Sequence, residues 1–446
     1  MTGPQGAAPV NAFADFVRRS HARGSLVVQP RMGFGDPRAM REGLIAVKGA
    51  NATTVGTITL DSYTRLGKLA DARRAVAEGG DLNGYPIRTH ATATNLAVLE
   101  GVRERDFPVQ VRHGSAAPQG IIASSLEAGL DTTEGGPVSY CLPYGRLPLR
   151  QAVQNWAQSC EVLVQARERG LEPHVETFGG CMLGQLCPPS LLVAISLLEG
   201  LFFRQHGLRS VSLSYAQQTN AAQDREAVLA LRRLADTLMP DLDCHIVIYN
   251  YMGVYPRTRA GALLLLEQAA ELAVRTGAER LIVKTAAEAH RIPTVGENVE
   301  ALEIAALAAQ NAGGYAPSGL SSGSGSGVAA AAAGSEVLDE ATALVHAVLD
   351  LNEDIGAALV EAFARGLLDV PYCLHPDNAG RSRSFIESDG RLRWSHTGSL
   401  PVRASGRSVA GQRMTATDLL QALSYVEQTF DRAAATNLDR ALRAPH

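Results

Sequence analysis

Short runs rich in β-branched and apolar residues alternate with segments of helical periodicity between about residues 25 and 314. Apolar residues recur three and four positions apart in 151–167 and 224–238, which predicts amphipathic helices there. Alternating strands and helices favour a parallel sheet covered by helices, and eight strands favour a closed (β/α)8 TIM-type barrel over an open doubly wound sheet. The eight predicted strands are 26–30, 54–60, 85–89, 108–112, 174–178, 210–215, 245–249 and 281–284.

The pattern changes after residue 314. Residues 318–334 are rich first in glycine and serine and then in alanine, which is typical of a flexible connector. No GK[ST] follows, so the stretch is not a phosphate loop. A helix is predicted to resume at Glu336, with a strand at 392–394 and a final helix from Ala416. We therefore predict four parts: an N-terminal arm (1–24), the catalytic barrel (25–315), a connector (316–335) and a smaller C-terminal α+β region packed on the barrel (336–446).

Composition limits the function classes. The chain has 446 residues and a formal net charge of −4, without a long basic or acidic run, so we expect neither nucleic acid nor a membrane surface as partner. The longest apolar stretch, 191–203, contains Glu199 and is too short to span a bilayer, which predicts a buried helix. No signal-peptide pattern begins the chain, and six cysteines without a CxxC pair predict free thiols and no metal site. These features predict a cytoplasmic protein.

Basic residues follow several of the predicted strands. Arg31, Arg65 and Arg112 stand at or just beyond strand ends, and Lys284 ends the last strand. In barrel enzymes these ends converge on the active site. Each arginine could instead pair with a structural carboxylate, and for a single arginine that reading is preferable. Three together repel one another by about 4 kcal/mol per close pair at an effective dielectric near 20, which favours an anionic ligand. Arginine is also the side chain that grips carboxylates with two hydrogen bonds.

The segment 134–144 forms a long loop after the fourth predicted strand and carries one carboxylate and two phenols. Glu134 could accept hydrogen bonds from a substrate ammonium, although a structural turn with core tyrosines explains the spacing equally well. Three arginines and one glutamate would give each carboxylate and the ammonium of a dicarboxylic amino acid an opposite partner. Neither a GxSxG elbow nor an HExxH helix occurs, which argues against hydrolysis by those mechanisms.

Several of these runs, in this order, resemble the epsilon (large) subunit of glutamate mutase, also called methylaspartate mutase. The resemblance extends from about Val27 to residues 378–380. The runs that carry it are 29–31 (QPR), 59–65 (TLDSYTR), 82–86 (LNGYP), 110–114 (QVRHG), 134–136 (EGG), 139–140 (SY), 143–144 (PY) and 282–285 (IVKT) with Glu288.

The resemblance implies an isomerase that interconverts L-glutamate and threo-3-methylaspartate reversibly, by a radical route that uses adenosylcobalamin. It implies that Glu134 is the catalytic residue, which holds the substrate ammonium and acts as a base. The substrate-binding residues that it implies are Arg31, Arg65, Arg112, His113, Glu134, Tyr140 and Tyr144. The residues that it implies contact the cofactor are Gly33, Asn83, Pro143, Tyr255, Lys284, Glu288 and Ile292.

A partner subunit is also implied. Cobalamin mutases that bind the cofactor through a histidine carry a DxHxxG motif. Asp243 and His245 begin like this motif, but Ile248 stands at the glycine position and His245 lies inside a predicted strand, so we interpret it as a barrel histidine. The resemblance therefore implies a separate small sigma-type subunit that carries DxHxxG and shares the cofactor. It also implies a homodimer of this chain within a heterotetramer.

Two alternatives stay open at this stage. Met32 and Phe34 are larger than the residues usual in the family, and Tyr251 and Tyr255 stand where Trp and Phe are usual. These departures allow a related mutase that acts on a different acidic amino acid. A non-catalytic barrel that binds an amino acid is the second alternative, and the intact set of substrate and cofactor residues argues against it.

Overall fold

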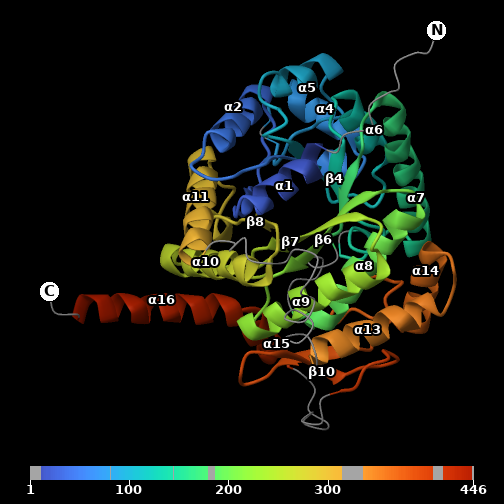
Figure 1. The fold of residues 1–446 in the computed structure, drawn as a ribbon, viewed down its shortest axis with the longest axis vertical. Helices are drawn as coiled ribbons and strands as arrows, with labels where there is room; N and C mark the ends of the chain where they lie inside the picture. The colour runs from blue at the N-terminus through green and yellow to red at the C-terminus, as the bar shows by residue number, and fades with distance from the viewer. Residues whose placement is uncertain are drawn as a thin grey trace.

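The computed structural model describes residues 12–80, 82–143, 145–178, 186–313, 335–404 and 415–443. Eight parallel strands form one sheet in the order β1-β8-β7-β6-β5-β4-β3-β2. Between β1 and β2, Val28 bridges Thr54, and its N–H donates to the Thr53 carbonyl at 2.9 Å, so the two edges meet. The sheet is therefore a barrel surrounded by helices, which confirms the (β/α)8 fold class (Figure 1). The strands are β1 Val27–Gln29, β2 Gly56–Thr59, β3 Val109–Arg112, β4 Thr132–Glu134, β5 His174–Glu176, β6 Ser210–Ala216, β7 Asp243–Tyr249 and β8 Arg280–Ile282.

The sequence prediction misplaced one strand. Residues 85–89 do not form a strand: Tyr85 makes a single bridge to Leu60, and the Thr89 N–H then donates to the Pro86 carbonyl in a local turn. The missing strand is β4, whose polar sequence Thr-Thr-Glu lacks the apolar run that marks the others. As a consequence, Glu134 ends a strand and does not belong to the loop in which we predicted it.

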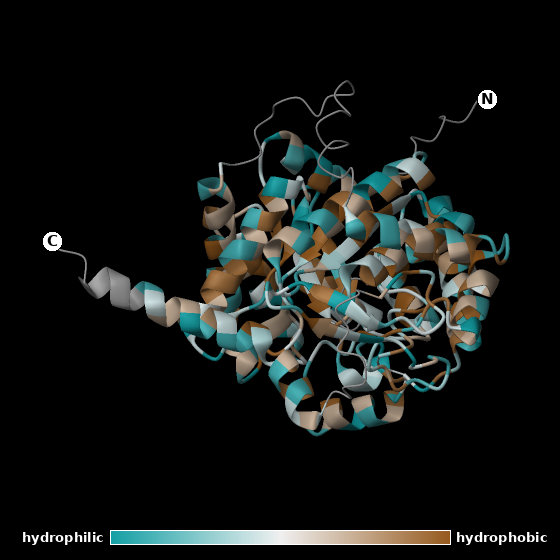
Figure 2. Cartoon of the chain, turned by 90° about the horizontal axis from the view of Figure 1, so that it is seen from below, coloured by the Kyte–Doolittle hydropathy of each residue, from teal (hydrophilic) through white to brown (hydrophobic). Residues whose placement is uncertain are grey.

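Helices cover the barrel on its outside. Hydrophobic and hydrophilic residues alternate along most of them (Figure 2), as expected for helices with one face on the sheet and one outside. The 3-10 helices are η1 Ala166–Arg169 and η2 Ala286–Ala289. The α-helices between β1 and the C-terminal region are α2 Pro37–Lys48, α3 Ser62–Arg65, α4 Leu69–Ala77, α5 Thr92–Leu99, α6 Gln119–Glu127, α7 Leu149–Gln165, α8 Pro189–Gln205, α9 Ala221–Leu238, α10 Arg259–Thr276 and α11 Val295–Asn311.

The C-terminal elements form a second layer over part of this ring. They are α13 Glu336–Leu349, α14 Ile355–Arg365, an antiparallel pair of β9 Arg383–Ile386 and β10 Leu392–His396, α15 Ala416–Leu423 and α16 Tyr425–Arg443. Because α13 packs on α8, residues 189–203 of α8 are buried, which confirms the buried helix predicted there. The helix at Glu336, the strand at 392–394 and the helix from Ala416 are confirmed as well. Helix α16 packs on α10 and then projects from the body (Figure 1).

The structure tests some of the sequence predictions only in part. No helix in the described segments is long and apolar enough to cross a bilayer, and the cytoplasmic location stays a prediction. The four-part division of the chain is likewise a prediction, and residues 316–334 of its connector lie outside the described residues. Cys141, Cys160, Cys187, Cys244 and Cys373 are free thiols, as predicted.

Helix α1 (Ala12–Ala22) closes the amino-terminal end of the barrel. Its Phe13 is 1% exposed and stacks on the ring of His174, the first residue of β5, with 5.2 Å between the ring centroids. The guanidinium of Arg280, the first residue of β8, lies 4.9 Å from the Phe13 ring centroid. The predicted N-terminal arm thus includes a helix that covers the base of the barrel.

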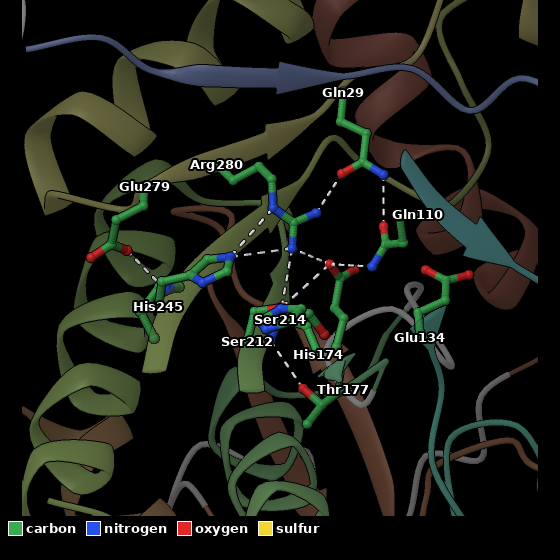
Figure 3. Close-up of polar contacts among 12 residues, drawn as sticks. Gln29, Gln110, Glu134, His174, Thr177, Ser212, Ser214, His245, Glu279 and Arg280 are labelled. Carbon is green, nitrogen blue, oxygen red and sulfur yellow. Dashed lines mark hydrogen bonds and ion pairs between the residues drawn. The ribbon is translucent and has the colours of Figure 1, made fainter. Parts of the chain in front are cut away.

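The interior above Phe13 is polar. Arg280 forms a fully buried ion pair with Glu176 of β5 and donates to Gln29 and, at 3.0 Å, to the Ser212 hydroxyl (Figure 3). His245 lies 3.4 Å from the Arg280 Nε inside β7, which confirms that it is a barrel histidine. Barrel interiors are usually filled by branched apolar side chains, so this polar interior is a specific feature of the chain.

Phe13→Ala tests the role of α1 as the base of the barrel. Removing a fully buried phenyl ring leaves a cavity, and we expect the free energy of unfolding to fall by about 3–5 kcal/mol. Denaturation by urea measures this loss. Ile45→Ala on α2, where the side chain is 49% exposed, is the matched control and should change stability by less than about 1 kcal/mol. An equally small loss for Phe13→Ala would show that α1 is not needed to close the barrel.

Candidate active site

A cavity of about 610 Å³ lies at the carboxyl ends of the strands. The residues predicted from the sequence that line it are Arg31, Gly33, Arg65, Asn83, Arg112, His113, Glu134, Tyr140, Glu288 and Ile292. Pro143, Tyr255 and Lys284 are not among its lining residues, and Tyr144 lies outside the described residues. The structure therefore brings most of the predicted site together in one place.

The three arginines reach this cavity from three successive strands. Arg31 follows β1, Arg65 ends the short helix α3 that follows β2, and Arg112 ends β3. Arg31 pairs with Glu288 at 2.8 Å, and Arg112 donates from Nε to Glu134 Oε2 at 2.7 Å. Two of the three thus have carboxylate partners within the protein.

Arg65 differs from the other two arginines. It forms no ion pair with a carboxylate in the part of the chain that the structure describes, and its Nε is buried without a hydrogen-bond partner. The side chain of Asp61 caps α3 by accepting from the Thr64 N–H at 3.0 Å, which fixes the turn that carries Arg65. Arg291 also lines the cavity but pairs with Glu297 at 2.6 Å. After these pairings, the cavity keeps one unmatched positive charge, that of Arg65.

Glu134 is fixed at the floor of the cavity. Its side chain is 3% exposed and accepts hydrogen bonds from three sides. Arg112 and, at 2.8 Å, the Tyr249 hydroxyl donate to Oε2, and the Tyr140 hydroxyl donates to Oε1. A carboxylate held in this way has little freedom to turn, so a ligand meets it in one orientation.

The turn after β4 is held by a second buried carboxylate. Glu199 of α8 accepts from the N–H groups of Val138 and Ser139 at 2.9 and 2.8 Å, and burial raises the pKa of its carboxyl to about 7. Gly136 is required here, because a Cβ at that position would lie 2.1 Å from the Glu199 carboxyl. This packing sets the position of Tyr140 against Glu134.

His113 is held as a hydrogen-bond donor. Its Nδ1 accepts from the Ser115 N–H at 3.0 Å, so the hydrogen of the neutral ring must be on Nε2. Burial, together with the charge of Arg65, lowers the pKa of the imidazole to about 3, which keeps the ring neutral. Nε2 is buried and has no partner among the described residues. The ring therefore offers one N–H to a ligand of the cavity that it lines.

The remaining predicted residues form the rim and the wall behind it. Gly33 packs so closely on β2 that a Cβ would lie 2.2 Å from the Thr59 carbonyl oxygen. Asn83 accepts from the Ser62 N–H at 3.0 Å, and Ile292 is 61% exposed at the rim. The Lys284 ammonium lies 4.1 Å from the centroid of the Tyr255 ring.

Lys284 has an unusual environment for an ammonium group. Burial lowers the pKa of its side chain to about 8, although Glu288 nearby opposes this shift. Glu288 also accepts from the Thr285 N–H at 3.1 Å, so its carboxylate is shared between this turn and Arg31. The wall behind the cavity thus carries a lysine that loses its charge more easily than an exposed one.

Several residues of the site were not predicted from the sequence. Phe178 and Arg291 line the cavity, and Tyr249 and Glu176 lie beside Glu134. The sequence prediction rested on basic residues at strand ends and on the segment 134–144, whereas Tyr249 is a tyrosine at the end of β7 and Glu176 is a glutamate at the end of β5. A glutamate in the middle of the predicted strand 174–178 was the available signal, because alternation places it on the same side as His174 and Phe178.

A family model and two sequence relatives match this chain to the same protein family. The family model described as "Methylaspartate mutase E chain (MutE)" matches residues 9–418. A protein of Halobacterium salinarum named glutamate mutase epsilon subunit is 32% identical over 397 residues, which are 86% of this chain and 79% of that protein. A protein of the same name from Escherichia coli O157:H7 is 28% identical over 359 residues, covering 77% of this chain and 72% of that one.

The state of His113 can be tested without knowing the ligand. We expect ¹⁵N NMR of the histidine side chains to show a neutral ring with its hydrogen on Nε2, and no titration of this ring in the range where an ordinary histidine titrates, near pH 6.5. A His113 ring that takes up a proton near neutral pH would contradict the assignment.

Proposed function

Because the chain belongs to the methylaspartate mutase E chain family, we propose that it is the catalytic large subunit of a glutamate mutase. In this proposal it converts L-glutamate reversibly into threo-3-methylaspartate and requires adenosylcobalamin. The observation that carries the proposal is the charge pattern of the cavity, in which Arg65 has no carboxylate partner among the described residues and stands with Glu134 in one site.

The substrate's charges fit this pattern. L-glutamate carries two carboxylates and one ammonium, so its net charge of about −1 offsets the unmatched charge of Arg65. Arg65 and the N–H of His113 can hold one carboxylate, and the guanidinium groups of Arg31 and Arg112 are available to the other. The ammonium is then bound by Glu134, which makes that residue the acceptor of an ammonium proton.

The cofactor residues fit one face of adenosylcobalamin. The cavity has a volume of about 610 Å³, and residues at its opening would hold the adenosyl group of the cofactor. Gly33, Asn83, Glu288 and Ile292 surround this opening, and the absence of a Cβ at Gly33 keeps the loop close to the barrel. When bound, adenosylcobalamin supplies the carbon radical that starts the rearrangement.

This chain's own task is to bind and orient the substrate and to keep water away. Helix α1 closes the base of the barrel, and the side chains of Arg112 and Glu134 are 5% and 3% exposed. Such a dry site strengthens the contacts to a charged substrate and protects a reactive intermediate from side reactions.

A partner subunit follows from the same reasoning. His245 is buried in β7 beside Arg280, so it would not reach a cofactor held at the mouth of the barrel. The relatives are named epsilon subunits, which is the name of one component of an assembly. We therefore propose a small sigma-type cobalamin-binding subunit with DxHxxG, and a homodimer of this chain within a heterotetramer.

Reconstitution tests the proposed function directly. We expect the chain to convert L-glutamate into 3-methylaspartate only when a DxHxxG subunit and adenosylcobalamin are both added, because half of the cofactor site is supplied by the partner. The product is measured by chromatography. Formation of a different rearranged acid from another acidic amino acid would favour the alternative substrate, and turnover by this chain alone would contradict the proposed partner.

Arg65→Lys tests the carboxylate contact. Lysine keeps the charge but loses the planar fork, and one to two hydrogen bonds to a charged group correspond to a fall in kcat/KM of about 10- to 100-fold. The control is Arg73→Lys, because Arg73 is exposed on α4. Equal kcat/KM values for the two variants and the wild type would exclude Arg65 as a substrate ligand.

A further inference from the structure

Two glutamates lie side by side under the cavity. Glu134 of β4 and Glu176 of β5 are direct neighbours in the strand register, and both are buried. Tyr249, the last residue of β7, places its hydroxyl between them. This hydroxyl contacts Glu134 Oε2 at 2.8 Å and also Glu176 Oε1.

The Tyr249 hydroxyl carries one proton but contacts two carboxylates. It can donate to Glu134 or to Glu176, but not to both at once. Both contacts are hydrogen bonds only when a second proton sits on one of the two carboxyls and is donated to the phenol oxygen. The arrangement is therefore suited to a site in which the number of protons changes.

The surroundings of Glu176 are rich in hydrogen-bond donors. Its Oε2 accepts from Arg280, from Gln110 Nε2 at 3.3 Å and from the Ser212 hydroxyl at 3.4 Å. The Arg280 guanidinium and the Gln110 amide nitrogen can only donate, so they hold Glu176 Oε2 as an acceptor. Figure 3 shows Arg280 at the centre of this network, between Gln29, His245 and Ser212.

Glu134 is the carboxyl whose proton number can change. It faces the cavity, whereas Glu176 does not line it. The charged and titratable groups that face Glu134 are Arg112 from β3, Tyr140 from the turn after β4, Glu176 from β5 and Tyr249 from β7, with Arg65 and His113 lining the same cavity.

We propose that Tyr249 and Glu176, with Glu176 held by Arg280, are positioning residues that let Glu134 take up and return a proton without losing hydrogen bonds. The inference rests on the proposed function, in which Glu134 accepts a proton from the substrate ammonium. Before the transfer, the Tyr249 O–H donates to Glu134. When the ammonium N–H bond breaks, an O–H bond forms on Glu134.

The hydroxyl of Tyr249 then changes direction. It rotates to donate to Glu176, and its oxygen accepts from the new O–H of Glu134. No proton leaves the site, and the steps reverse when the proton returns to the product amine. The buried carboxylate of Glu176 thus gives the Tyr249 hydroxyl a second acceptor, so Glu134 keeps its hydrogen bond to Tyr249 in both protonation states. An orienting carboxylate supports a catalytic base in a similar way.

Tyr249→Phe is the most direct test. The ring keeps its packing against Phe178, where the centroids are 5.4 Å apart, and only the hydroxyl is lost. In the reconstituted enzyme we expect kcat to fall about 10- to 100-fold, part of what an acid–base group contributes, while KM changes less than about threefold. Glu134→Gln in the same assay gives the larger loss that follows from removing the base itself.

Tyr215→Phe is the matched control. Tyr215 of β6 is also a buried barrel tyrosine that donates to a carboxylate, Asp224 Oδ1, at 2.7 Å, but it does not line the cavity. We expect a similar loss of thermal stability and an unchanged kcat. If Tyr249→Phe keeps the wild-type kcat, or loses no more than Tyr215→Phe does, the proposal is wrong.

The pH–rate profile of Glu176→Gln distinguishes a positioning role of Glu176 from a purely structural one. Removing the negative charge beside Glu134 favours ionised Glu134, so the acid limb of the pH–rate profile should move to lower pH while the plateau falls. Because Arg280 would then be buried without its partner, Glu176→Gln/Arg280→Met is the second variant, which removes both charges. An acid limb that stays in place in folded Glu176→Gln, or a plateau that stays at the wild-type level in the folded double variant, would overturn the proposal.

Infrared spectra separate this inference from the proposed function. The carboxyl band of protonated Glu134 in the substrate-free chain is the band that is lost in Glu134→Gln. The pH at which half of this band remains is its midpoint, and it can be measured without turnover. We expect this midpoint to move to lower pH in Glu176→Gln. If the wild-type complex does not act on glutamate, the proposed function fails. An unchanged midpoint in Glu176→Gln means instead that the coupling of the two carboxyls is wrong.

Discussion

The ion pair between Arg280 and Glu176 is the interaction on which the rest of the site depends. Both side chains are fully buried, and the desolvation of such a pair is compensated only by good geometry and further hydrogen bonds. Gln29, Gln110 and Ser212 supply these bonds from three other strands. The pair therefore ties five strands of the barrel together at one level, where a barrel normally packs apolar side chains.

This network continues in both directions along the barrel axis. Below it, the Arg280 guanidinium lies on the ring of Phe13, whose helix closes the base. Above it, Tyr249 connects Glu176 to Glu134, and Arg112 binds Glu134 from the other side. The charges of Arg280 and Arg112 balance those of Glu176 and Glu134, so Arg65 at the cavity is left with no described carboxylate partner. A ligand that carries one net negative charge balances Arg65 as well, and this is why we favour a dicarboxylic amino acid.

The sequence allowed the mouth of the barrel to be predicted better than its interior. Arg31, Arg65 and Arg112 were found because carboxyl ends of parallel strands meet in a barrel, and this rule does not depend on exact strand limits. Strand β4 was missed because its residues Thr132–Glu134 are polar where the interior is polar, so no apolar run marks it. Residues 85–89 were mistaken for a strand because their composition resembles one, although only Tyr85 pairs with the sheet. The roles of Tyr249 and Glu176 depend on contacts between strands far apart in the sequence, which local periodicity cannot reveal.

A crystal structure of the chain, assembled with its cobalamin-binding subunit and bound to L-glutamate, tests the central claim most directly. The account predicts one substrate carboxylate on Arg65 and the His113 N–H, the other within reach of Arg31 and Arg112, and the ammonium within hydrogen-bonding distance of Glu134. Glutamate bound elsewhere, or in this cavity with its ammonium directed away from Glu134, would contradict it.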